Sequence, residues 1–125
     1  MSKYSYYAIP GLPRPEKINI TPDLLLIKTS QFFNIGLNFL AGKSRLAEYV
    51  KARQFYFYFG RHIEGFTLTS IAKSVNRDHT TVIHGISTLQ DMFDTDPLYR
   101  KQWAHFIEFI NDRPEAVYSN KNHAA

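Results

Sequence analysis

Residues 67–93 carry two short helical patterns separated by a very tight break, and this pairing constrains the fold more than any other feature of the chain. Thr67 or Thr69 can cap the first helix, and Asp78 can cap the second. The small Ala72 stands where two helices joined so closely must approach each other. The apolar positions of the second helix recur at amphipathic spacing: Val82, Ile86, Leu89 and Phe93. The pattern predicts a helix-turn-helix within an all-α domain.

The remainder of the chain also has helical periodicity. Thr21 starts a helix that ends near Asn34, residues 37–40 form a short turn, and a longer helix runs over about 46–60. Asp96 precedes a last helix. We therefore expect an irregular arm, a small helix-turn-helix domain, and an extra C-terminal helix with a tail, covering residues 1–20, 21–93 and 94–125.

The aromatic run 55–59 could suit a strand by composition, or could stack the bases of a single strand. The segment before it is strongly helical and contains no break, so the run should continue the helix. At helical spacing only part of it can face outward, and core packing is the favoured role.

Composition and charge exclude several classes of protein. The chain has 125 residues, no cysteine and a formal net charge of +4. These values exclude a disulfide framework, a thiolate metal site and a two-domain enzyme, and no apolar run reaches membrane-spanning length. Residues 41–90 hold seven basic and three acidic side chains, so an anionic partner should dock there. We expect a cytoplasmic protein without membrane contact.

The second helix of the pair begins with short polar side chains, Asp78 to Thr81. A helix N-terminus favours phosphate, and His and Thr can hydrogen-bond base edges in the major groove. From the pattern alone, a DNA-reading helix and an ordinary capped helix both remain open.

The string Arg77-Asp-His-Thr-Thr-Val82 closely resembles the signature of the C-terminal DNA-binding domain, domain IV, of the bacterial replication initiator DnaA. Lys43-Ser-Arg45 resembles the basic loop of that family, and Ala52-Arg53-Gln54 its A-R-Q segment. Ser70-Ile71-Ala72 is similar to the family's first helix-turn-helix helix. The resemblance covers about residues 18–93.

The resemblance implies double-stranded DNA as the partner. Arg45 would enter the minor groove, and other residues would contact bases in the major groove. The base-reading set is Arg45, Leu68, Thr69, Asp78, His79, Thr80 and Thr81. The phosphate-binding set is Lys43, Arg53, Gln54, Arg61, Lys73 and Arg77.

Some positions depart from the family. Thr69 stands where a proline is common, Ala47 where a second basic residue is frequent, and Asn76 alone where two small residues are usual. Gly42-Lys43-Ser44 lacks the upstream glycine and the preceding strand of a phosphate loop. We therefore expect a stand-alone DNA-binding protein without the ATPase module, and with no nucleotide, cofactor, metal site or enzymatic activity.

Sequence-specific binding at sites like the DnaA box, in replication initiation or its regulation, is the first functional hypothesis. Two alternatives remain. The protein could recruit a partner through the N-terminal arm or the acidic C-terminal third, or it could be an all-α interaction module that no longer binds DNA.

Overall fold

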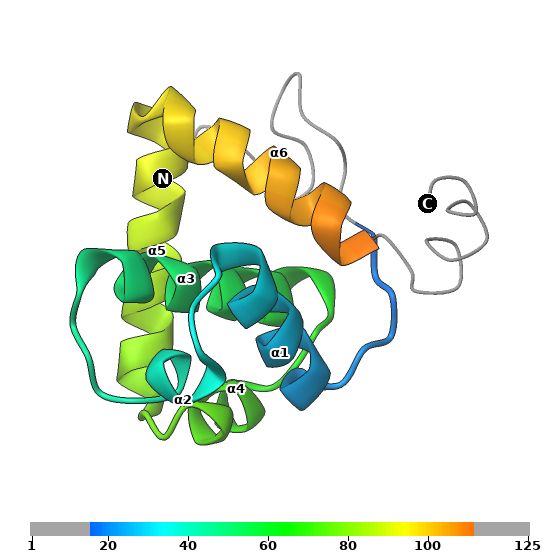
Figure 1. The fold of residues 1–125 in the computed structure, drawn as a ribbon, viewed down its shortest axis with the longest axis vertical. Coiled ribbons are helices and arrows are strands. Elements are labelled where there is room, and N and C mark those ends of the chain that lie inside the picture. The colour runs from blue at the N-terminus through cyan, green and yellow to red at the C-terminus, as the bar shows by residue number, and fades with distance from the viewer. Residues whose placement is uncertain (1–15, 112–125) are drawn as a thin grey trace.

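The computed structural model describes residues 16–111, and this part of the chain folds into helices alone (Figure 1). Their order is α1 Pro22–Phe33, α2 Leu37–Leu40, α3 Ala47–Tyr58, the π-helical turn η1 Phe59–Ile63, α4 Leu68–Ser74, α5 His79–Thr95 and α6 Pro97–Asn111. The predicted all-α fold class is confirmed. Most of the expected arm, and the tail after residue 111, lie outside the described residues. None of the helices within 16–111 is both long and apolar enough to cross a membrane.

Helix α1 begins and ends at the predicted positions. The side chain of Thr21 accepts a hydrogen bond from the Leu24 amide at 3.2 Å, and Pro22 occupies the first turn, where its missing N–H is not needed. Asn34 adopts a left-handed conformation with φ 55° and ends the helix. These local signals fix the boundaries of α1 without help from the core.

Two expectations about boundaries were incomplete. Residues 37–40 form the short helix α2 and not merely a turn, and the helix that follows does not stop at Gly60 but widens into η1. The Glu64 amide donates to the Phe59 carbonyl at 3.0 Å, which is the spacing of a π-turn. A Cβ at Gly60 would lie 2.9 Å from the Phe66 ring, so the close approach of this ring requires glycine.

The core is predominantly aromatic, and the run 55–59 lies at its centre. All five rings of this run are buried, with exposed fractions of 0–2%. Core packing is therefore confirmed, and it extends to the whole run. The reason is that α3 is enclosed by its neighbours on several sides: α1 and α6 contribute rings against Phe55, and α5 places Phe93 against Tyr58.

Helix α6 crosses over α3 and α1 and completes this core (Figure 1). Trp103 is 1% exposed, and its ring lies 5.3 Å from Phe55 and 5.2 Å from Tyr58. On the rim, the ammonium group of Lys51 lies 4.8 Å from the centre of the Tyr99 ring and donates to Gln102 at 2.9 Å. The helix therefore belongs to the same packed body as the helix-turn-helix.

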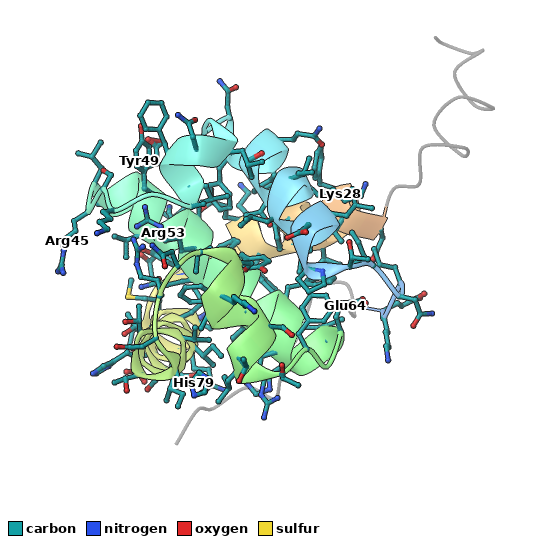
Figure 2. The ribbon with its side chains drawn as sticks, turned by 90° about the horizontal axis from the view of Figure 1, so that it is seen from below. Lys28, Arg45, Tyr49, Arg53, Glu64 and His79 are labelled. Carbon is teal, nitrogen blue, oxygen red and sulfur yellow. The ribbon has the colours of Figure 1, made fainter. Side chains whose placement is uncertain are left out.

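The segment that leads into α1 is held by a buried carboxylate. Glu64, which is 4% exposed, accepts hydrogen bonds from the Ile18 amide at 2.7 Å and the Ile20 amide at 3.1 Å. Asn19 between them adopts a left-handed conformation with φ 58°, which asparagine tolerates better than most residues. This contact fixes where the chain enters the domain, on the side away from the basic loop (Figure 2).

Candidate nucleic-acid interface

Helices α4 and α5 form the helix-turn-helix. The side chain of Thr67 accepts from the Ser70 amide at 3.0 Å, so Thr67 and not Thr69 caps α4. Asn76 then turns the chain with φ 53°, and the Arg77 amide donates to the Ala72 carbonyl at 2.9 Å. Ala72 is 4% exposed at this close approach. The single left-handed residue makes the turn short, as the sequence predicted.

Asp78 is the N-cap of α5. Its carboxylate accepts from the Thr81 amide at 3.0 Å and from the Thr81 hydroxyl at 3.2 Å. These hydrogen bonds, with the backbone one the larger cause, hold the pKa of Asp78 below its ordinary value. The capping carboxylate is therefore engaged within its own helix, which fixes the first turn of α5.

The first turn of α5 presents an exposed polar surface made by His79, Thr80 and Thr81. The imidazole Nε2 of His79 lies 3.0 Å from the hydroxyl oxygen of Thr69, so the starts of α4 and α5 are joined at the surface. Leu68, beside Thr69, is half-buried and packs against the core. The structure thus brings Thr69 to the exposed first turn of α5, whereas Leu68 packs against the core.

The basic loop, residues 41–46, connects α2 to α3 without regular structure. Lys43 and Arg45 are exposed, and Figure 2 shows the Arg45 side chain pointing away from the body of the protein. Within the loop, the Ser44 hydroxyl oxygen accepts from the Leu46 amide at 3.3 Å. Arg45 is therefore placed as a projecting cation on the same side of the molecule as α5 (Figure 2).

Arg53 does not lie where the predicted phosphate contact would place it. The residue is 5% exposed, and its guanidinium donates to the backbone carbonyls of Phe39, Leu40, Gly42 and Ser44 at 2.7–3.1 Å. Burial, and next to it the neighbouring charge of Arg77, lower the pKa of Arg53. The guanidinium is thus turned towards the loop backbone and away from solvent.

A groove of about 660 Å³ separates the basic loop from α5. Its lining contains six of the predicted residues: Lys43, Arg45, Arg53, Gln54, Arg77 and Thr81. Arg61 and Lys73 are exposed but lie outside this groove: Arg61 donates to the Phe66 carbonyl at 3.0 Å, and Lys73 borders a shallow hollow between α1 and α4. The groove is basic, because the four charged residues in its lining are all cationic.

Three further polar residues line the groove, Asn76, His84 and Thr88. From the sequence, Asn76 was expected only in the turn, and His84 and Thr88 were not predicted as site residues. A signal was present for the last two, since they follow Thr81 at helical spacing and must share its face of α5.

Residues 22–89 match the family model described as the bacterial DnaA protein helix-turn-helix. This chain belongs to that family. The match contains the basic loop, α4, the turn and the first eleven residues of α5, and it ends at residue 89, before α6 begins. The predicted resemblance to the C-terminal domain of DnaA is therefore confirmed.

Relatives of the DnaA family support the same assignment. The chain is 34% identical over 91 residues to the chromosomal replication initiator protein DnaA of Thermomicrobium roseum, covering 72% of this chain and 20% of that protein. The DnaA protein of Ruegeria pomeroyi is 32% identical over 104 residues, covering 82% and 21%. That of Flavobacterium psychrophilum is 30% identical over 98 residues, covering 78% and 20%. The chain spans about a fifth of the length of these relatives.

Proposed function

We propose that this protein binds double-stranded DNA in a sequence-specific manner, at sites like the DnaA box, and acts in replication initiation or its regulation. The observation that carries the proposal is the arrangement of two projecting elements on either side of a basic groove: the first turn of α5 and the loop arginine Arg45. A major groove admits a helix, and a narrow minor groove attracts an arginine.

In this proposal each element has a distinct task. His79, Thr80 and Thr81 contact base edges in the major groove, and Arg45 enters the adjacent minor groove. Lys43 and Arg77, which line the groove between them, bind the phosphates of the intervening strand. Arg61, Lys73 and Gln54 are the other phosphate-binding residues of the proposal, and Arg53, which the sequence also predicted for this set, is left out because its guanidinium donates to backbone carbonyls.

The first test is a fluorescence-anisotropy titration at about 150 mM salt. The probes are a duplex containing a DnaA box, a scrambled duplex and a single strand of equal length. We expect at least about tenfold preference for the box, consistent with the 1–3 kcal/mol that a base contact contributes. Equal binding to both duplexes would contradict sequence specificity, and no binding to any probe would favour the interaction-module alternative.

Matched variants locate the interface. Arg45→Ala and His79→Ala should each weaken binding to the box about tenfold. Their controls lie on α6, where Lys101→Ala and His105→Ala remove exposed side chains of the same kinds and should change affinity less than about twofold. With four phosphate-binding cations, the slope of log affinity against log salt should be roughly −4.

The cellular role follows from the same proposal. A nucleoid-associated protein that occupies DnaA-box-like sites should concentrate at such sites in the host genome, and its depletion should change the ratio of origin to terminus DNA. Enrichment at sites without this sequence would argue against a role in initiation. Recruitment of a protein partner by the arm or the acidic C-terminal third stays a prediction; residues 1–15 of the arm and residues 112–125 of the acidic third lie outside the described residues.

A further inference from the structure

The buried side chain of Arg53 donates hydrogen bonds to the backbone of the basic loop and of the end of α2. The Nε of Arg53 donates to the Leu40 carbonyl at 2.7 Å, and one terminal nitrogen donates to the Ser44 carbonyl at 2.7 Å. The other terminal nitrogen donates to the carbonyls of Phe39 and Gly42, both at 3.1 Å. Every acceptor lies within residues 39–44, so a single guanidinium joins the end of α2 to most of the loop.

A second arginine ties the same loop to the helix-turn-helix. Arg77, in the turn before α5, donates to the Gly42 carbonyl and also to the Val75 carbonyl of its own turn. Gly42 therefore lies between two guanidinium groups. A Cβ at this position would meet the Asn38 carbonyl oxygen at 2.8 Å, so the close packing of the loop backbone also requires glycine here.

The contacts of Arg53 use the donors that a phosphate would need. A guanidinium has five N–H groups, and the four carbonyls around Arg53 engage all three of its nitrogens. Arg53 is also only 5% exposed, so it has no free pair of N–H donors to offer to a DNA strand. Arg45, in contrast, is exposed and points away from the body of the protein (Figure 2).

A loop that is already ordered loses less conformational entropy when it binds. The loop has no regular structure of its own, so its conformation depends on the hydrogen bonds from Arg53 and Arg77. We propose that Arg53 is a positioning residue: together with Arg77 it preorganises the basic loop so that Arg45 is presented to the minor groove, and its effect on DNA affinity is transmitted through Arg45 and not through a phosphate contact. This inference rests on the proposed DNA-binding function.

A double-mutant cycle tests the route of the effect. The variants are Arg53→Lys, Arg45→Ala and the double variant, titrated against the box duplex. Lysine keeps the charge but cannot reproduce the planar fork of donors. We expect Arg53→Lys to weaken binding about tenfold in the wild-type background, and less than about twofold once Arg45 is replaced by alanine. The additive control is Lys73→Ala, whose loss should be the same in both backgrounds.

Two outcomes of the cycle would overturn the proposal. One is an equal loss from Arg53→Lys with and without Arg45, which is the behaviour of an independent phosphate contact. The other is unchanged affinity in the wild-type background. If Arg53→Lys does not fold, Gly42→Ala takes its place in the cycle with the same expectations, because a Cβ there would meet the Asn38 carbonyl oxygen and displace the loop backbone that Arg53 and Arg77 hold.

A measurement without DNA separates this inference from the proposed function. Trypsin cleaves after lysine and arginine, so cleavage after Lys43 and Arg45 reports on opening of the loop, and mass spectrometry identifies the fragments. At a temperature where both proteins are folded by circular dichroism, we expect these cleavages to be at least about tenfold faster in Arg53→Lys and unchanged in Lys73→Ala. Equal rates would overturn the positioning role. Failure of the wild-type protein to bind duplex DNA would refute the proposed function without changing the cleavage result.

Discussion

Replacing Trp103 with alanine should greatly lower the free energy of unfolding of this domain. The indole is 1% exposed and lies among five aromatic rings, at centroid distances of 5.2–6.1 Å. A buried aromatic side chain removes about 150–250 Å² from water, which at about 25 cal/mol per Å² corresponds to about 4–6 kcal/mol. Alanine retains a small part of this, so we expect a loss of about 4 kcal/mol, within the range for such truncations.

A loss of this size is a large fraction of the stability of a small domain, which is about 5–15 kcal/mol. For a domain of about 100 residues it should lower Tm by roughly 15–30 °C. Thermal unfolding followed by circular dichroism measures the shift, and urea titration gives the free energy independently.

The matched control is Leu98→Ala on the same helix. Leu98 is 71% exposed, so its truncation should change the free energy of unfolding by less than about 0.5 kcal/mol. If Trp103→Ala melted within a few degrees of Leu98→Ala, α6 would not be part of the core, and the argument from ring burial would be refuted.

Three further predictions concern single polar contacts. Thr69→Val removes the hydroxyl that lies 3.0 Å from the His79 imidazole, and should weaken binding to the box about three- to tenfold in the anisotropy titration, with recovery in Thr69→Ser. Glu64→Gln loses one of two acceptors for backbone amides, so urea titration should show a free energy of unfolding lower by about 1–3 kcal/mol. An unchanged value would show that the hydrogen bonds from the Ile18 and Ile20 amides do not stabilise the fold. Because hydrogen bonds from Thr81 lower the pKa of Asp78, this cap stabilises the fold above the unfolded pKa of about 3.9 and loses that contribution as the pH falls through the lower folded value. Asp78→Asn should remove this part of the acid dependence, measured by urea unfolding between about pH 2.5 and 7.

The helix-turn-helix was predictable because its signals are local. The Asp78 cap acts within three residues, the left-handed turn needs only Asn76, and the apolar face of α5 repeats within four positions. The uncertainty between Thr67 and Thr69 as the cap of α4 arose for the same reason, since both side chains suit the position. Hydrogen-bond geometry in the folded chain settled it in favour of Thr67.

The candidate site was predictable in composition but not in arrangement. The polar first turn of α5 and Arg45 are exposed, and Arg45 and Thr81 line the same groove, whereas their contacts with DNA stay a prediction. Arg61 and Lys73 were grouped with the same surface, yet neither lines the groove between the loop and α5. A list of basic residues contains no information about which side of a folded helix each one occupies once the helices have packed.

The sequence by itself therefore determined the longer helices, the caps Thr21 and Asp78, the short turn and the family to which the chain belongs, because each of these depends on residues close together in the chain. The tertiary structure decided that Arg53 contacts the loop backbone and that all five rings of the run 55–59 are buried. The carbonyls that receive the Arg53 guanidinium are 9–14 positions away, and Trp103 reaches Phe55 across 48 positions. Only the packing of α2, α3 and α6 brings such partners together. Because Arg53 is buried in this packing, its guanidinium supports the basic loop and does not lie at the surface.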